Sequence, residues 1–185
     1  MMKVCVFCGS NYGKDPAFQK DAEGLGKLLA KKGHSLIYGG SNRGLMGSVS
    51  TSCFKSGGEV IAVEPTFFLS WGATTDCVTQ TIPTVTMNER KQKMMEISDI
   101  FLALPGGIGT LDEISDVMTD IGLGQVKGKL ILFNINHFYE PVLELLKTYY
   151  DQGFLKEDWS GYPIVCDSLE EVEKALDEFE KTYRR

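Results

Sequence analysis

The sequence predicts an α/β fold of the doubly wound, Rossmann-like kind, formed by a single domain that covers residues 1–185. Two observations carry this prediction. Continuous runs of Val, Ile, Leu and Phe alternate along the chain with segments of helical period, and strands that are apolar on both faces are typical of a parallel sheet covered by helices. The length of 185 residues, with 43% hydrophobic and 24% charged content, also suits one globular domain of ordinary composition.

Each apolar run is short enough for a strand and is followed by a helical pattern. The expected strands are KVCVFC (3–8), HSLIYGG (34–40), EVIAVEP (59–65), DIFLALP (99–105), KLILFN (129–134) and YPIVC (162–166). The expected helices cover 16–32, 45–57, 88–98, a segment from about Thr110, 139–152 and 168–183. Residues 66–85 have no clear period; their aromatic side chains, Phe67, Phe68 and Trp71, line a pocket or cover the core.

Composition excludes several classes of partner and location. The net charge of −6 and a pI of about 5.0 leave no broad basic face for nucleic acid or for an anionic membrane. The start of the chain is too short an apolar run for a signal peptide, so we expect a cytoplasmic protein. Cys5 and Cys8 spell C-x-x-C, but residues three apart on a strand face opposite sides, so we expect no metal ion there.

Three of the expected strands end in glycine-rich turns: CGSNYG, YGGSNRGLMG and PGGIGT. In a doubly wound sheet these ends lie along one edge, where ligands bind. A helix N-terminus presents free N–H groups and a partial positive charge to an anion, and glycine lets a phosphate approach. PGGIGT therefore indicates a phosphate site, with the Thr110 hydroxyl as a further donor; the alternative is that the glycines only allow a tight connection. It is neither a Walker loop nor a dinucleotide fingerprint.

The local sequence allows two interpretations of Glu113. Thr110 and Glu113 fit [ST]-x-x-E, a capping box in which the glutamate satisfies its own helix. The glutamate could instead act on a ligand, together with Arg90 and Lys91 of MNERKQKMM (87–95), which would face an anionic substrate across the cleft. The alternative for Arg90 and Lys91 is a solvated helix face.

The motifs YGGSNRGLMG, ERK and PGGIGTLDE resemble those of the LONELY GUY (LOG) family of cytokinin-activating phosphoribohydrolases, often mislabelled lysine decarboxylases. The family hallmark, P-G-G-x-G-T-x-x-E, is matched at every fixed position by residues 105–113. The resemblance extends to about Gly153. It implies a Rossmann-like homodimer without cofactor that cleaves the N-glycosidic bond of a nucleoside 5′-monophosphate, releasing the free base and ribose 5-phosphate.

The resemblance also implies the site residues. Arg90 and Glu113 are the expected catalytic residues, with Arg90→Ala and Glu113→Ala expected to abolish turnover but not folding. The expected substrate-binding residues are Gly9, Ser10, Gly39, Gly40, Arg90, Lys91, Gly106, Gly107, Ile108, Gly109, Thr110, Leu111, Asp112, Glu113 and Thr119. The helices that follow Arg90 and Thr110 are the expected dimer interface.

This chain departs from the family pattern at Ser41, Gly72, Asn88 and residues 119–123, which surround the base rather than the phosphate. Cytokinin ribotides and AMP therefore both remain candidate substrates. Three other classes of function stay open: a non-catalytic nucleotide-binding or sensing module, a pyridoxal phosphate decarboxylase that uses Lys91, and an NAD-linked oxidoreductase. The second lacks a marked partner for the pyridine nitrogen, and the third lacks its fingerprint.

Overall fold

The computed structural model of the protein describes residues 1–69, 76–157, 159 and 161–183. Trp71 and Gly72, which the sequence analysis singled out, lie outside the described residues. The strands are β1 (Lys3–Phe7), β2 (Ser35–Tyr38), β3 (Val60–Pro65), β4 (Gln80–Thr84), β5 (Ile100–Ala103), β6 (Leu130–Phe133) and β7 (Ile164–Cys166). The helices are α1 (Pro16–Lys32), α2 (Gly44–Lys55), α3 (Thr66–Leu69), α4 (Met87–Glu96), α5 (Ile108–Gly122), the 3-10 turn Ile135–His137, α6 (Glu140–Asp151) and α7 (Leu169–Tyr183).

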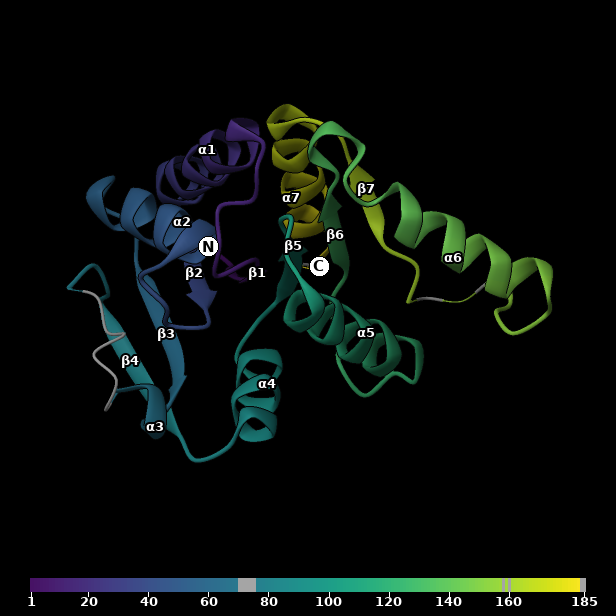
Figure 1. Ribbon diagram of the computed structural model, residues 1–185, viewed down its shortest axis with the longest axis horizontal. Helices are drawn as coiled ribbons and strands as arrows, with labels where there is room; N and C mark the ends of the chain where they lie inside the picture. The colour runs from purple at the N-terminus through teal and green to yellow at the C-terminus, as the bar shows by residue number, and fades with distance from the viewer. Residues whose placement is uncertain (70–75, 158, 160, 184–185) are drawn as a thin grey trace.

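The described strands form one parallel sheet in the order β4-β3-β2-β1-β5-β6-β7 (Figure 1). Cys5 at the centre of β1 is flanked by Ile37 of β2 and Phe101 of β5. The order reverses between β1 and β5, and in sheets of this kind the crevice beyond the carboxyl ends at that point is where ligands bind. The predicted fold class, a doubly wound parallel sheet, is confirmed.

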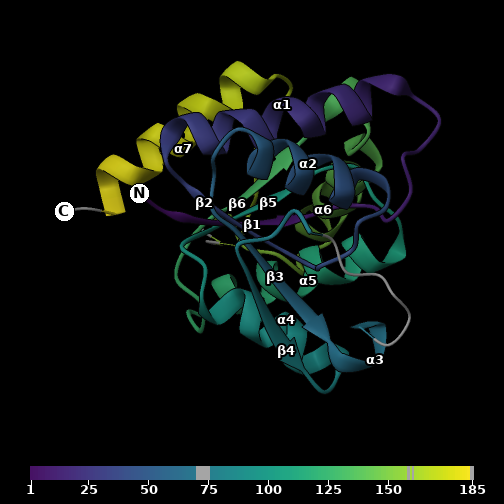
Figure 2. The same ribbon diagram turned by 90° about the vertical axis from the view of Figure 1, so that its left-hand side faces the viewer.

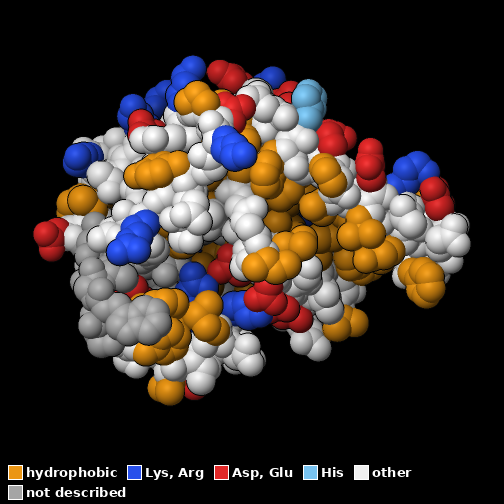
Figure 3. All heavy atoms as spheres, in the orientation of Figure 1, with side chains coloured by type: hydrophobic (Ala, Val, Ile, Leu, Met, Phe, Trp, Pro, Cys, Tyr) orange, Lys and Arg blue, Asp and Glu red, His pale blue; other side chains and the backbone are white. Residues whose placement is uncertain are grey.

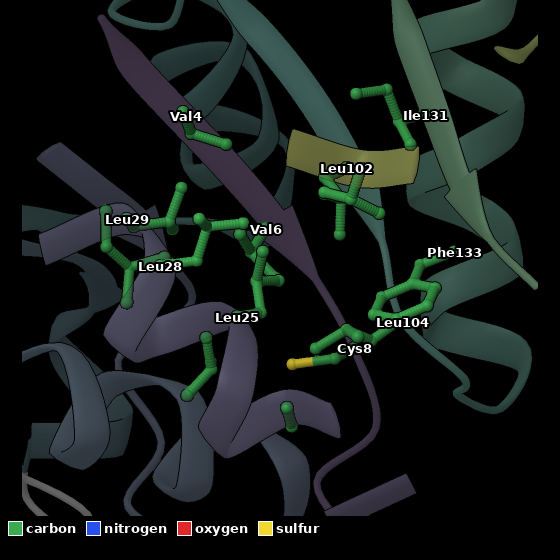
Figure 4. Close-up of a cluster of buried hydrophobic side chains, with 14 of the residues drawn as sticks. Val4, Val6, Cys8, Leu25, Leu28, Leu29, Leu102, Leu104, Ile131 and Phe133 are labelled. Carbon is green, nitrogen blue, oxygen red and sulfur yellow. The ribbon is translucent and has the colours of Figure 1, made fainter. Parts of the chain in front are cut away.

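Helices cover both faces of the sheet, as Figure 2 shows, with α1, α2 and α7 above it and α4 and α5 below it. The upper core packs Leu25 and Leu29 of α1 against alternate residues of β1 (Figure 4). The lower core packs the apolar stripe of α5, which includes Ile114 and Val117, against the other face of the strands. Strands buried on both sides explain why the sequence shows continuous apolar runs rather than alternation.

The two faces of the sheet also separate the two cysteines of the C-x-x-C motif. Cys8 lies in the upper core and Cys5 in the lower core, so the two thiols point to opposite sides of the sheet, as predicted. Across the described residues no cluster of His, Cys, Asp and Glu is arranged to hold a metal ion. Nor does any helix in the described ranges combine the length and the apolar run that crossing a bilayer requires.

Two elements differ from the sequence prediction. Strand β4 and the short helix α3 lie within residues 66–85, where no regular structure was predicted. β4 reads QTIPT, is largely exposed and pairs with β3 at the edge of the sheet. Pro83 cannot donate to a ladder and is tolerated because the strand is an edge. A short polar strand of this kind leaves no apolar run to recognise.

Candidate active site

A cavity of about 870 Å³ opens at the carboxyl edge of the sheet, at the reversal of strand order. The ends of β1, β2, β3 and β5 and the N-terminal halves of α4 and α5 line it. Acidic and basic side chains gather where this face is hollowed (Figure 3). The cavity brings together most of the predicted site residues: Gly9, Ser10, Gly39, Arg90, Lys91, Gly106, Gly107, Ile108, Gly109, Thr110, Asp112 and Glu113.

The first turn of α5 faces the cavity with bare backbone. Helix α5 begins at Ile108, Gly107 is its N-cap, and no side chain in the described part of the chain caps it. The first amides of a helix have no partner within the helix, so Ile108, Gly109 and Thr110 present N–H groups to the cavity. A Cβ atom at Gly107 or Gly109 would meet no described atom within 4 Å. Neither glycine is therefore required by contacts with the protein, and both leave space for a ligand.

Gly106 has a different reason to be glycine. A Cβ atom there would overlap the side chain of Thr110 and crowd Gly9. The Gly9 amide donates to the Pro105 carbonyl at 3.1 Å, which ties the turn after β1 to the turn after β5. Gly106 thus lets two cavity-lining turns pack closely.

Glu113 does not cap its own helix, so the capping-box interpretation is wrong. Thr110 is the third residue of α5 rather than its N-cap, because the helix begins two residues earlier than predicted. The Glu113 carboxylate instead accepts a hydrogen bond from Arg90 Nη1 at 2.9 Å. A residue that local spacing assigns equally to a cap or a site is thereby placed at the cavity wall.

Arg90 and Glu113 form a buried ion pair, with exposed fractions of only 6% and 9%. Arg90 comes from α4, and its Nε also donates to the Val63 carbonyl of β3 at 3.2 Å. Gly39, at the end of β2, lies under the guanidinium, where a Cβ atom would overlap it. The glycine, the carbonyl and the carboxylate together fix the position of the guanidinium over the strand ends.

Burial and charge act in opposite directions on Glu113. Burial raises the pKa of the Glu113 carboxyl above its ordinary value of 4.5, while the adjacent Arg90 charge and hydrogen bond pull the pKa down. The net shift is upward. The site therefore holds a carboxylate more basic than an exposed glutamate, which suits a group that orients or accepts a proton.

Lys91 is held by two carboxylates at the edge of the cavity. Its Nζ lies 2.8 Å from Asp112 and 2.7 Å from Asp116. Burial lowers the pKa of Lys91, but hydrogen bonds to these aspartates outweigh it, so the net shift is upward. A lysine that forms a Schiff base needs a depressed pKa, so this environment argues against the decarboxylase alternative.

The turn after β2 does not repeat the arrangement at α5. The amides of Leu45 and Met46, in the first turn of α2, donate to the Gly9 carbonyl at 3.1 and 3.4 Å. Gly44 has φ of 56° and packs against the Ser10 and Asn11 backbone. The glycines of YGGSNRGLMG therefore make room for protein groups, and α5 is where the bare amides lie.

Three predicted residues do not line the cavity: Gly40, Leu111 and Thr119. Gly40 has φ of 87° and packs against the Glu64 side chain. Thr119 is exposed and lies 11 residues after the start of α5, or about 16 Å along the helix axis. Its part in substrate binding stays a prediction.

Sequence reasoning missed several residues that line the cavity: Tyr12, Arg43, Glu64, Met87 and Phe138. Phe68, which the sequence assigned to a pocket or to the core, also lines it. For Glu64 a signal was present, because it is the one charge in the run VIAVEP and stands at the carboxyl end of the strand. For Met87 there was none, since a methionine at the start of a helix looks like a packing residue.

The family described as "possible lysine decarboxylase" matches residues 46–176 of the chain. The chain is 36% identical over 181 residues to the cytokinin riboside 5′-monophosphate phosphoribohydrolase LOG of Oryza sativa subsp. japonica, covering 98% of this chain and 75% of that protein. It is 35% identical over 168 residues to the cytokinin riboside 5′-monophosphate phosphoribohydrolase of Rhodococcoides fascians, covering 90% and 85%.

Among solved structures, the molybdenum cofactor binding protein of Rippkaea orientalis has a TM-score of 0.73 at 22% identity, covering 97% of this chain and 98% of that one. At that identity the likeness establishes the fold alone. The family match over residues 46–176 and the relatives that align over nearly the whole chain show that this protein belongs to the LOG family.

Proposed function

We propose that this protein hydrolyses the N-glycosidic bond of a nucleoside 5′-monophosphate, releasing the free base and ribose 5-phosphate. The observation that carries the proposal is the buried Arg90–Glu113 pair beside the uncapped first turn of α5. The amides of α5 are suited to the phosphate. The ion pair, one turn further along, would then lie beneath the sugar and its bond to the base.

The chemistry of the bond gives each partner a role. As the C1′–N bond breaks, positive charge develops on the ribose, and the bonding electrons leave with the base. The Glu113 carboxylate stabilises that positive charge and orients or deprotonates the water whose oxygen joins C1′. The water supplies the proton that the base gains. Arg90 holds Glu113 in place and offsets the negative charge on the departing base.

Hydrolysis is tested by incubating the protein with AMP and with N6-isopentenyl-AMP and separating the products by chromatography. We expect free base and ribose 5-phosphate from at least one of them. The matching nucleosides, which lack the phosphate, are expected to be poor substrates. Tight nucleotide binding without any release of base would contradict hydrolysis and leave a binding or sensing module.

Gly109→Ala is expected to weaken phosphate binding without harming the fold. Alanine is favoured over glycine in helices by up to about 1 kcal/mol, and beyond its own helix its Cβ would meet no described atom within 4 Å. The methyl group would instead occupy the space beside the amides, and loss of one charge-assisted hydrogen bond raises KM about tenfold to a hundredfold. Steady-state kinetics and a thermal melt give both quantities.

Ser115→Ala is the matched control, because Ser115 is exposed on α5 and its hydroxyl, among the described residues, donates only to the Leu111 carbonyl of its own helix. It should leave KM unchanged. A Gly109→Ala protein with the KM of the wild type would show that the phosphate binds elsewhere.

The acid limb of the pH profile should lie above the ordinary glutamate pKa. Glu113 acts as a carboxylate, and burial raises its pKa above 4.5 despite the Arg90 charge. As pH falls through the raised value the group protonates, and kcat/KM should decline before the pH reaches 4.5. Glu64 is also buried. If a Glu64→Gln variant keeps the acid limb at the same pH as the wild type, the limb belongs to Glu113 and not to Glu64. Undiminished kcat/KM at pH 4.5 would contradict this role.

We also propose that two copies of the chain associate. Helix α6 extends away from the body (Figure 1) and has no buried residue. Leu145, Tyr149 and Tyr150 on it, and Phe154 beyond it, are exposed, and several large exposed apolar side chains on one element are typical of an interface. This location differs from the helices named on sequence grounds. Light scattering should give a dimer for the wild type and a monomer for Leu145→Glu/Tyr149→Glu; a monomeric wild type would refute the proposal.

A cytoplasmic location remains part of the proposal. It is supported by Cys5, Cys8, Cys53 and Cys166, whose buried thiols are free, as is usual in a reducing compartment. Fractionation of cells that express the protein tests it.

A further inference from the structure

Glu64 is a second buried carboxylate in the same cavity. It lies next to the end of β3, in a strand whose other residues are apolar, and only 2% of it is exposed. Its side chain packs against Gly40, where a Cβ atom would approach the Glu64 Cδ to 2.9 Å. It lines the cavity together with Phe68 and Met87.

The Glu64 carboxylate has no hydrogen bond or ion pair with any residue that the structure describes. The nearest cation, Arg90, is directed instead to Glu113 and to the Val63 carbonyl. Burial raises the pKa of Glu64, and the Arg90 charge only partly opposes it. The Glu64 oxygens are not among the fully enclosed polar atoms of the described residues that lack a partner, and the residue lines the cavity. The carboxylate is therefore available to accept a hydrogen bond from a group that enters the cavity.

The positions of the strand ends indicate which part of a substrate would bond the Glu64 carboxylate. The uncapped turn of α5 follows β5, and Glu64 is the last residue but one of β3, three strands away in the order β3-β2-β1-β5. Adjacent strands are about 4.8 Å apart, so about 14 Å separates the two positions. The Arg90–Glu113 pair lies between them, because Arg90 reaches from β3 to α5. A nucleotide with its phosphate at α5 and its sugar at Glu113 therefore directs its base toward Glu64.

We propose that Glu64 selects the base by accepting a hydrogen bond from an exocyclic amino group. This inference rests on the proposed function, because it uses the same placement of phosphate and sugar. An ionised carboxylate is an acceptor only. It attracts the amino group of a 6-aminopurine and repels the carbonyl oxygen of a 6-oxopurine at the same position. Phe68 and Met87 supply apolar surface for the planar ring.

Three substrates isolate this contact: AMP, purine riboside 5′-monophosphate, which has hydrogen in place of the amino group, and IMP, which has oxygen there. We expect the wild type to prefer AMP to purine riboside 5′-monophosphate by about tenfold to a hundredfold in kcat/KM, as for one hydrogen bond to a charged group. IMP should be disfavoured further.

Two substitutions change the preference in different ways. Glu64→Leu removes the acceptor and should bring the ratio of AMP to purine riboside 5′-monophosphate close to one. Glu64→Gln supplies both a donor and an acceptor and should reduce the discrimination against IMP. Glu96→Gln, at an exposed carboxylate of α4 that pairs with Lys93, is the matched control and should leave every ratio unchanged.

A folding role would give a different result. Leucine replaces an unpartnered buried carboxylate with an apolar group, so Glu64→Leu should melt at or above the temperature of the wild type. A lower melting temperature with equal losses for all three substrates would overturn the inference. Ratios that remain those of the wild type in both variants would overturn it as well.

Equilibrium binding separates this inference from the proposed function. The affinities of the three nucleotides are measured by calorimetry in the Glu113→Gln background, where turnover is suppressed, with and without Glu64→Leu. If the wild type releases no ribose 5-phosphate but Glu64→Leu removes the preference for AMP in binding, hydrolysis fails and base selection by Glu64 stands. If hydrolysis occurs and the binding preference does not depend on Glu64, only the inference fails. Absence of any nucleotide binding overturns both.

Discussion

Glu113→Gln is expected to lower kcat for nucleotide hydrolysis by about 10²- to 10⁴-fold, the range for removal of a general acid or base. Glutamine keeps the shape of the side chain and an oxygen that can accept from Arg90 Nη1, now 2.9 Å from the carboxylate. It loses the charge that stabilises the sugar cation and the basicity that acts on water. Single-turnover product formation and thermal melting distinguish a loss of chemistry from a loss of folding.

Nucleotide affinity should survive this substitution. The phosphate is assigned to the amides of α5, which Glu113→Gln does not alter, so the dissociation constant should stay within a few fold of the wild type. Glu144→Gln, in helix α6, which contributes no described residue to the cavity, is a control expected to retain full activity. A Glu113→Gln protein with more than about a tenth of the wild-type kcat would remove Glu113 from the mechanism.

Arg90→Ala is expected to abolish turnover and, contrary to the expectation from sequence, to destabilise the fold. Removing one partner of a buried ion pair leaves the other charge uncompensated, which costs about 3–5 kcal/mol of unfolding free energy. Arg90 is only 6% exposed and Glu113 9%, so water cannot replace the guanidinium fully. Denaturant unfolding measures the loss.

The loss should depend on pH in a defined direction. The folded-state pKa of Glu113 is raised above 4.5, so the stability that it contributes is fully present below the unfolded-state pKa and lost as pH rises through the folded value. Arg90 is the group that holds this pKa down, so Arg90→Ala raises it further. The stability deficit relative to the wild type should therefore be small near about pH 4 and larger near about pH 8.

A double variant checks the cause. Arg90→Met/Glu113→Leu replaces the pair with apolar groups of similar volume, which is often neutral or stabilising. It should recover most of the stability that Arg90→Ala loses, and its deficit should no longer vary with pH in this way, while turnover stays absent. A deficit in Arg90→Ala that grows toward acid pH would contradict the assignment of the buried charge.

The fold was largely predictable because each central strand is buried on both faces. The runs around Ile37, Ile61, Phe101 and Ile131 are almost entirely apolar and buried, and a parallel sheet covered on both faces is the structure that requires this. β4 was not predictable in the same way, because it is exposed and has one neighbour. Its place is set by pairing with β3 rather than by its own side chains.

The part of the site that glycine-rich turns and strand ends form was predictable from the sequence. The bare turn at Gly107 and Gly109 follows from glycines after a strand, and the meeting of Arg90 with Glu113 follows from strand ends that share an edge. Local spacing did not decide whether Glu113 capped its helix, because that depends on where α5 begins. Glu64 was missed because a single charge at a strand end does not show, from sequence alone, whether the folded chain supplies it with a partner.

The most direct test of the account is a crystal structure of the Glu113→Gln protein with AMP bound. The account predicts the phosphoryl group within hydrogen-bonding distance of the amides of Gly109 and Thr110, the ribose over residue 113, and the adenine amino group at Glu64. A phosphoryl group against Arg43, or anywhere else away from the first turn of α5, would contradict it.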